Sequence, residues 1–99
     1  MEVFAVDVGL FGGIFVRKVL FPAIGDYVSG HDHALDHITM VSQGRIRFRC
    51  PVTGIDRDIV APDFIETPAR ARHEMTAVEP NSCAWCIFAV PDGDMTGTA

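Results

Sequence analysis

The sequence predicts an all-β domain, built as a sandwich or a barrel. Short runs rich in β-branched and aromatic residues follow one another, and glycines and prolines separate them at close intervals. In order, the runs are EVFAVDV, IFVRKVLF, HITMVSQ, RIRFRC, RDIVA, DFIET, RHEMTAVE and CAWCIFAV. A small barrel closes its own edges, which suits a chain with much apolar β sequence and few charges to protect an exposed edge.

The strand expected at residues 45–50 has the clearest alternation. Its three arginines point to one face and its three apolar residues to the other. Tight turns are expected on both sides of this strand, at Gly44 in SQGR and at Gly54 in VTGID, because glycine tolerates the positive φ that such turns require.

Length and charge limit the possible functions. At 99 residues the chain is expected to form a single domain over residues 1–99. A net charge of −5 disfavours binding to nucleic acid. The apolar run VGLFGGIFV is far shorter than the roughly 20 residues of a membrane-spanning helix, and the first charged residues, Glu2 and Asp7, are unlike the basic start of a signal peptide. We therefore expect a cytoplasmic protein that binds neither nucleic acid nor membrane.

The cysteines are read as reduced thiols. There are three, an odd number, without a recognisable secretion signal, which argues against a disulfide framework. Cys83 and Cys86 have the CxxC spacing of redox pairs and zinc ribbons, but the run around them is apolar and β-rich. Residues three apart on a strand point to opposite faces, so a packed strand is the favoured interpretation over a redox motif.

The histidines carry the strongest chemical signal. Three of the four lie within seven residues, at His31, His33 and His37, and the fourth is His73. On a strand, His31 and His33 would share one face about 7 Å apart, close enough for both rings to reach one ion. A site of nitrogen ligands favours a divalent transition metal (Fe, Zn, Ni, Mn or Cu) over Mg or Ca. The pattern favours such a metal site over four unrelated surface histidines.

A helix is the alternative for residues 29–41. Ser29 would be its N-cap, and His33 and His37 would form the HxxxH pair of zinc proteases. That motif needs a glutamate directly after its first histidine as the general base, and this chain has Ala34 there. On this alternative the protease would lack its base.

The spacing around the histidines resembles the first motif of the cupins, small β-barrel proteins that hold a metal inside the barrel. That motif runs glycine, five residues, HxH, three or four residues, glutamate, six residues, glycine. This chain matches every spacing from Gly25 through His31 and His33 to Gly44, and differs only in having His37 at the position of the glutamate.

A second, degenerate motif strengthens the resemblance, which covers about residues 19–90. The cupin pattern runs glycine, five residues, proline, any residue, glycine, two residues, histidine, three residues, asparagine. Pro68 and His73 keep their positions, whereas Pro62, Arg70 and Ala77 replace the two glycines and the asparagine. Arg70 either clamps a carboxylate at the barrel mouth or is a solvated loop residue, and the second reading is favoured.

The resemblance implies a cupin-type double-stranded β-helix, a jelly-roll barrel, whose metal ligands are His31, His33 and His73. His37, at the carboxylate position, either binds the metal too or points at the cavity without ligating. From strand alternation, Thr39 and Val41 share the face of His37, and Met75 shares that of His73. These three are therefore candidate residues of a substrate pocket beside the metal.

The implied function is that of a metal-binding cupin acting on a small anionic organic molecule, as a dioxygenase or an isomerase. The alternative is a non-catalytic module that senses or stores a small ligand, and a further one is a structural β-domain without metal. No catalytic acid or base is evident. Because cupins commonly pair, and because the N-terminal third is strongly apolar, we expect a homodimer whose other partner is a small-molecule ligand.

Overall fold

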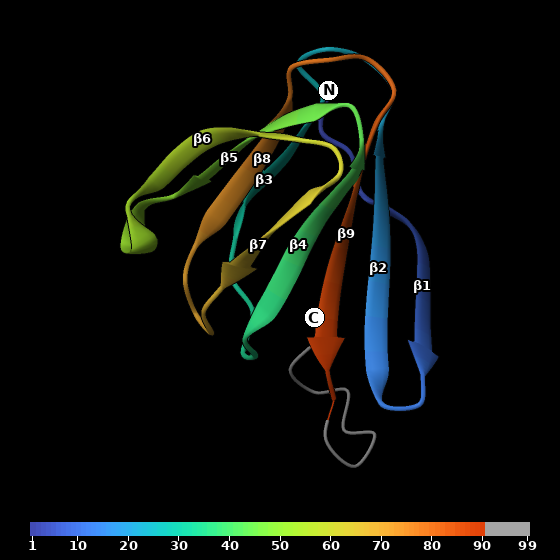
Figure 1. The fold of residues 1–99 in the computed structure, drawn as a ribbon, viewed down its shortest axis with the longest axis vertical. Helices are drawn as coiled ribbons and strands as arrows, with labels where there is room; N and C mark the ends of the chain where they lie inside the picture. Colours follow the sequence, from blue (N-terminus) through green and yellow to red (C-terminus); the bar gives the residue numbers. More distant parts are fainter. Residues whose placement is uncertain (91–99) are drawn as a thin grey trace.

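The computed structural model of the chain describes residues 1–90, which form nine β-strands and one short 3₁₀ helix (Figure 1). The elements are β1 (Ala5–Phe11), β2 (Ile14–Phe21), β3 (Tyr27–His31), β4 (His37–Gln43), β5 (Arg45–Cys50), η1 (Pro51–Thr53), β6 (Ile55–Val60), β7 (Asp63–Thr67), β8 (His73–Ala77) and β9 (Ser82–Ala89). The all-β prediction is confirmed. The helix alternative for residues 29–41 is wrong, because β3 ends at His31 and β4 begins at His37.

The strands form two sheets with antiparallel pairing throughout. The five-stranded sheet has the order β1-β2-β9-β4-β7, and the four-stranded sheet has the order β3-β8-β5-β6. Figure 1 shows β1 at the outer edge of the larger sheet, beside β2, with β9 on the other side of β2. The chain crosses from one sheet to the other between β2 and β3, and again between β3 and β4, which places residues distant in sequence opposite one another.

The core lies between the inner faces of the two sheets. Most strands contribute alternate residues to this space, because side chains alternate along a strand, whereas β1 is almost entirely exposed. The main buried cluster includes Val19, Val41 and Ala84 of the larger sheet and Ile46, Phe48 and Met75 of the smaller one. Apolar burial on both inner faces therefore holds the sheets together.

The alternation predicted for residues 45–50 is confirmed in β5. Ile46, Phe48 and Cys50 are at most 1% exposed. The arginines on the opposite face form ion pairs, including Arg47 with Asp56 at 2.8 Å and Arg49 with Glu74 at 3.4 Å. These pairs are largely exposed, so each contributes little to stability.

Both turn glycines adopt the positive φ that the sequence predicts. Gly44 has φ 78° and Gly54 has φ 73°. The two differ in their surroundings. A Cβ at Gly44 would lie 2.9 Å from the backbone Cα of Ser82, whereas a Cβ at Gly54 would meet nothing within 4 Å. Gly44 is therefore needed both for its conformation and for its lack of a side chain.

The cysteines are free and buried, as expected for a packed strand. Cys83 and Cys86 both lie on β9, three residues apart and hence on opposite faces. Burial raises the pKa of the Cys86 thiol above its ordinary value. A raised thiol pKa leaves little thiolate at neutral pH, which disfavours a redox role for this side chain.

No helix within residues 1–90 has the length and apolar character needed to cross a lipid bilayer.

Candidate metal centre

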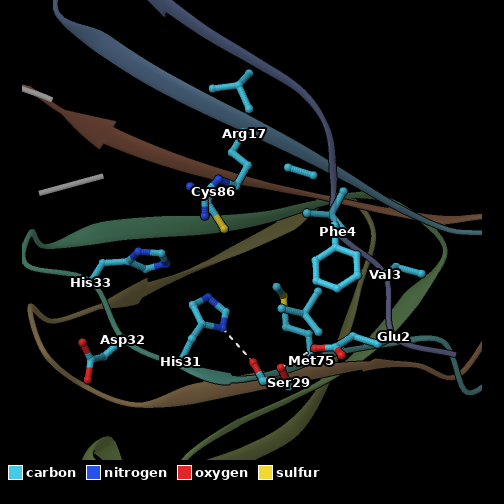
Figure 2. A pocket seen from close by; sticks show the side chains of 14 residues that line it. Glu2, Val3, Phe4, Arg17, Ser29, His31, Asp32, His33, Met75 and Cys86 are labelled. Carbon is cyan, nitrogen blue, oxygen red and sulfur yellow. Dashed lines mark hydrogen bonds between the residues drawn. The ribbon is translucent and has the colours of Figure 1, made fainter. Parts of the chain in front are cut away.

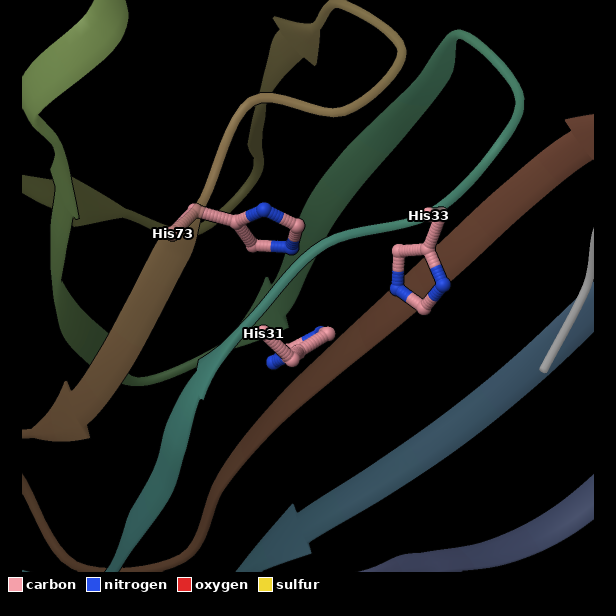
Figure 3. A group of neighbouring side chains, drawn as sticks. All are labelled: His31, His33 and His73. Carbon is pink, nitrogen blue, oxygen red and sulfur yellow. The ribbon is translucent and has the colours of Figure 1, made fainter.

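The fold brings His31, His33 and His73 together. His31 is the last residue of β3 and His73 the first of β8, and the two are directly paired in the register of these neighbouring strands. His33 follows in the connection to β4. Figure 3 shows the three rings pointing toward one another from these elements. One ligand nitrogen from each ring lies within 4.8 Å of the others, so the three can hold a single metal ion.

Backbone carbonyls fix the proton positions of three rings. Nδ1 of His31 lies 2.8 Å from the Ser29 carbonyl oxygen, Nδ1 of His73 lies 2.9 Å from that of Ala71, and Nδ1 of His37 lies 3.4 Å from that of Leu35. A carbonyl oxygen can only accept a hydrogen bond, so each Nδ1 carries the proton and donates it. In a neutral ring this leaves the Nε2 lone pair free for a metal.

Two of these Nε2 atoms test whether the site fits a metal. Nε2 of His73 and Nε2 of His37 are buried and have no hydrogen-bond partner. A buried polar atom without a partner normally costs about 1–3 kcal/mol. A metal ion bound to these lone pairs would remove that cost. Neutral nitrogen donors in a buried site fit a divalent transition metal.

His37 reaches the cluster from the opposite sheet. It begins β4, where it is paired with Thr67 of β7 on one side and with Phe88 of β9 on the other. Its ring centroid lies 5.0 Å from those of His33 and His73. The fourth histidine thus adjoins the other three, while the set of nitrogens within 4.8 Å consists of His31, His33 and His73.

Burial keeps the rings of His37 and His73 neutral at physiological pH. The pKa of His37 is lowered to about 4, first by burial and then by the neighbouring His73 and His33. Burial also lowers the pKa of His73, and the nearby His31 adds to this effect. A neutral ring binds a metal without first releasing a proton, so both rings are prepared for ligation.

Aromatic side chains form the wall behind the cluster. Phe88 lies 5.0 Å from His33 and 4.9 Å from His37 between ring centroids, and Phe48 stacks on His73 at 5.7 Å. Phe48 and Phe88 are themselves fully buried. Because these rings exclude water from one side, charge interactions at the cluster are stronger than they would be in solvent.

A cavity of about 470 Å³ opens beside the cluster (Figure 2). His31 and His33 line it, and so does Met75, one of the three pocket residues expected from the sequence. Thr39 and Val41 are completely buried and do not line this cavity, and Val41 belongs to the main core cluster. The remaining lining residues are Glu2, Val3, Phe4, Ala5, Val8, Arg17, Val19, Val28, Ser29, Asp32 and Cys86.

Arg17 is the cavity residue that sequence reasoning missed. It lies on β2 between Phe15 and Val19, both of which are buried, so its side chain leaves the strand on the inner face. The run IFVRKVLF has apolar residues at both odd and even positions, and the alternation therefore does not tell which of Arg17 and Lys18 points inward. The one hint in the sequence is that two cations stand next to each other in an otherwise apolar strand, so that one of them has to point inward.

Arg70 supports the connection that carries His33. It has a positive φ of 64°, at the position where the cupin motif has glycine, and its backbone N–H donates to the His33 carbonyl at 2.7 Å. Its guanidinium lies 3.5 Å from Asp32 in an exposed pair. Arg70 does not line the cavity, which fits the loop interpretation and not the clamp.

Asp36 has a similar supporting role. Its carboxylate accepts a hydrogen bond from the Ala69 backbone N–H at 2.7 Å, which ties the loop before β4 to the loop before β8. Together with the contact between Arg70 and His33, this bond fixes the two histidine-bearing loops against each other.

Comparisons of sequence find no protein-family model and no curated protein that match the chain. Solved structures do match. KdgF from a Halomonas species is 24% identical with a TM-score of 0.74, over 90% of this chain and 80% of that one. A cupin superfamily protein from Desulfitobacterium hafniense is 18% identical with a TM-score of 0.72, over 89% of this chain and 77% of that one. The DMSP lyase DddQ from Ruegeria pomeroyi is 18% identical with a TM-score of 0.70, over 85% of this chain and 42% of that one.

At these identities the likeness concerns the fold. It agrees with the two antiparallel sheets of this chain. The chain thus has a cupin-type fold, a double-stranded β-helix, with a histidine cluster inside that can hold a metal ion.

Proposed function

We propose that the protein is a metal-dependent enzyme that acts on a small anionic organic molecule, as a dioxygenase or an isomerase. In this proposal His31, His33 and His73 bind a divalent transition metal, and His37 is the fourth ligand. The observation that carries it is the convergence of three ring nitrogens within 4.8 Å, beside a cavity large enough for a small substrate.

The residues have separate tasks. The histidines hold the ion through Nε2, while the carbonyls of Ser29 and Ala71 keep the rings of His31 and His73 oriented. When bound, the metal would act as a Lewis acid, and four neutral ligands would leave its charge uncompensated, which favours anionic substrates. The apolar cavity wall would exclude water from the substrate.

A non-catalytic ligand-binding module is the second candidate, and one observation favours it. The two carboxylates that line the cavity are already engaged: Glu2 accepts a hydrogen bond from the Ser29 hydroxyl, and Asp32 pairs with Arg70. Neither is positioned as a free general base. Metal-dependent turnover of any substrate would exclude this candidate.

In both cases we place the protein in the cytoplasm, because its three cysteines are unpaired.

Metal content tests the proposal. The full chain, purified without a histidine tag and reconstituted with Fe, Zn, Ni, Mn or Cu, is analysed by plasma mass spectrometry beside three variants. We expect near-stoichiometric metal in the parent and loss of it in His73→Ala. Glu74→Ala is the matched control, since this neighbour of His73 points outward to Arg49, and it should keep the metal.

The His37→Ala variant decides the number of ligands. Loss of metal from this variant supports four histidine ligands, and full retention limits the site to His31, His33 and His73. A parent chain that takes up no metal after reconstitution would contradict the proposed enzyme. Equal metal in His73→Ala and in the parent would place the ion elsewhere.

A further inference from the structure

Arg17 is a charged residue on the inner face of the larger sheet. Its neighbours on that face of β2, Phe15 and Val19, are only 2% and 4% exposed. Arg17 itself is half-buried, and its side chain lines the cavity beside His31 and His33. Its guanidinium can therefore meet a molecule that enters this cavity.

The register places Arg17 near the histidines. It is paired with Cys86 of β9, and Cys86 is paired with Thr39 of β4, so these three side chains form one row on the inner face. The next row toward the cluster contains Phe15, Phe88 and His37. Strand spacing and rise give a separation of about 12 Å between the Cα atoms of Arg17 and His37, a distance that two side chains and a small molecule can span.

The cavity around Arg17 is mostly apolar, and its charged lining residues among those described are Arg17, Glu2 and Asp32. Among the described residues that line it, Arg17 is the one with an Arg or Lys side chain. Figure 2 shows Arg17 beside Cys86 on the side of His33, with Phe4 and Met75 on the remaining wall. From this position the Arg17 guanidinium can donate charge-assisted hydrogen bonds to an anion in the cavity.

We propose that Arg17 binds the carboxylate of the substrate, and that the substrate is a monocarboxylate with an apolar body. The guanidinium fork matches a carboxylate with two parallel hydrogen bonds. A phosphate fits less well, since its second charge would face Glu2 and Asp32, which also line the cavity, with no second cation to offset it. That this ligand is a substrate, reacting at the histidine site, rests on the proposed function. Binding of its carboxylate by Arg17 does not.

A purely structural role makes a different prediction. The Arg17 guanidinium lies 5.8 Å from the centroid of the Phe15 ring, in a cation–π contact. If this contact were its purpose, replacing Arg17 would change stability and leave ligand affinity unaltered.

Binding of defined probes to the full chain separates these readings. Hexanoate, its neutral counterpart hexanamide, and hexyl phosphate are titrated by nuclear magnetic resonance into zinc-loaded and metal-free protein. We expect hexanoate to bind at least about tenfold more tightly than hexanamide, and more tightly than hexyl phosphate. Arg17→Gln should remove the preference for hexanoate, and Arg17→Lys should keep part of it.

Lys18→Gln is the matched control. It removes the same charge one residue along the same strand, on the outer face where Lys18 lies over the Trp85 ring at 5.2 Å. This variant should bind hexanoate like the parent. The zinc content of each variant, measured in the same samples, reports on the histidine site independently.

The outcomes are distinct. Hexanoate affinity that is equal in the parent and in Arg17→Gln overturns the inference, whether or not zinc is bound. A preference for hexyl phosphate overturns the assignment of the substrate as a carboxylate. If zinc fails to bind but Arg17 still determines hexanoate affinity, the proposed function fails and the anion site stands.

Discussion

His37 combines a buried position with a proton that the folded protein disfavours. The imidazole of an unfolded chain has a pKa of 6.5, whereas the pKa of His37 in the folded protein is lowered to about 4. Between these values the unfolded state binds more protons. Acidification from pH 6.5 to 4 therefore lowers the free energy of unfolding of the metal-free protein, by on the order of 3 kcal/mol for this residue. Above pH 6.5 the stabilisation that comes from neutral His37 is fully present.

The measurement is urea unfolding of protein treated with a chelator, at pH 7.5, 6 and 5. The parent should lose less stability between pH 7.5 and 6 than between pH 6 and 5, because the loss falls below pH 6.5. His37→Gln should lose less, and some slope should remain because burial lowers the pKa of His73 too. Parallel pH dependence in the parent and in His37→Gln would show that His37 does not titrate as the geometry implies.

The sequence was sufficient to predict the histidines but not the arginine. An HxH pair has few structural explanations, and the spacing puts His31, His33 and His73 at the three histidine positions of a known motif, with His37 in place of its glutamate. Arg17 had no such motif. Which face of a strand is buried depends on the neighbouring strands, so only the pairing of β2 with β9 decides that Arg17 and not Lys18 points inward.

The turn between β4 and β5 depends on a close contact with a distant element. Gly44 has positive φ, and an added Cβ would lie 2.9 Å from the Cα of Ser82 in β9. We expect Gly44→Ala to destabilise the protein by about 3 kcal/mol, since it adds a backbone clash to the cost of left-handed geometry.

Gly54→Ala is the control for this prediction. Its φ of 73° is similar, but its Cβ would meet nothing within 4 Å, so only the conformational cost of about 1 kcal/mol applies. Both variants are compared with the parent by chemical denaturation. Equal losses of stability in the two variants would mean that β9 yields at no cost to the methyl group at Gly44.

At the level of elements, local patterns predicted what local forces decide. The alternation in β5 and the glycine turns on either side of it were correct, because they depend on neighbouring residues. The sequence alone does not decide between a strand and a helix for the segment around His31 to His37. Residues 32–36 carry no periodic apolar pattern, and their path is set by bonds from other loops, such as that from Ala69 to Asp36.

At the level of the whole molecule, the two sheets divide the work of the site. The four-stranded sheet supplies His31 and His73, and the five-stranded sheet supplies His37 and Arg17. Neither sheet alone has all the residues of the proposed site, and the core between the sheets fixes their separation. Substitutions that loosen this core are therefore expected to weaken metal binding even when no ligand is changed.

The outer edge of the larger sheet is the place where we propose that a second copy of the chain binds. β1 is an edge strand with several exposed apolar side chains, among them Val6 at 58% and Phe11 at 69% (Figure 1). Asp7 is its only charged residue, so little prevents this edge from pairing with an identical strand. The opposite edge, β7, is protected by Asp63 and Glu66.

We therefore expect sedimentation equilibrium at micromolar concentration to give twice the chain mass of 10.8 kDa. Val6→Lys should shift the protein toward the monomer, because a charge on an edge strand opposes pairing between sheets. Phe64→Lys changes an equally exposed apolar residue, 62% accessible, on β7 and should leave the dimer intact. A parent that sediments as a monomer contradicts the dimer, and a dimer lost only in Phe64→Lys moves the interface to the other edge.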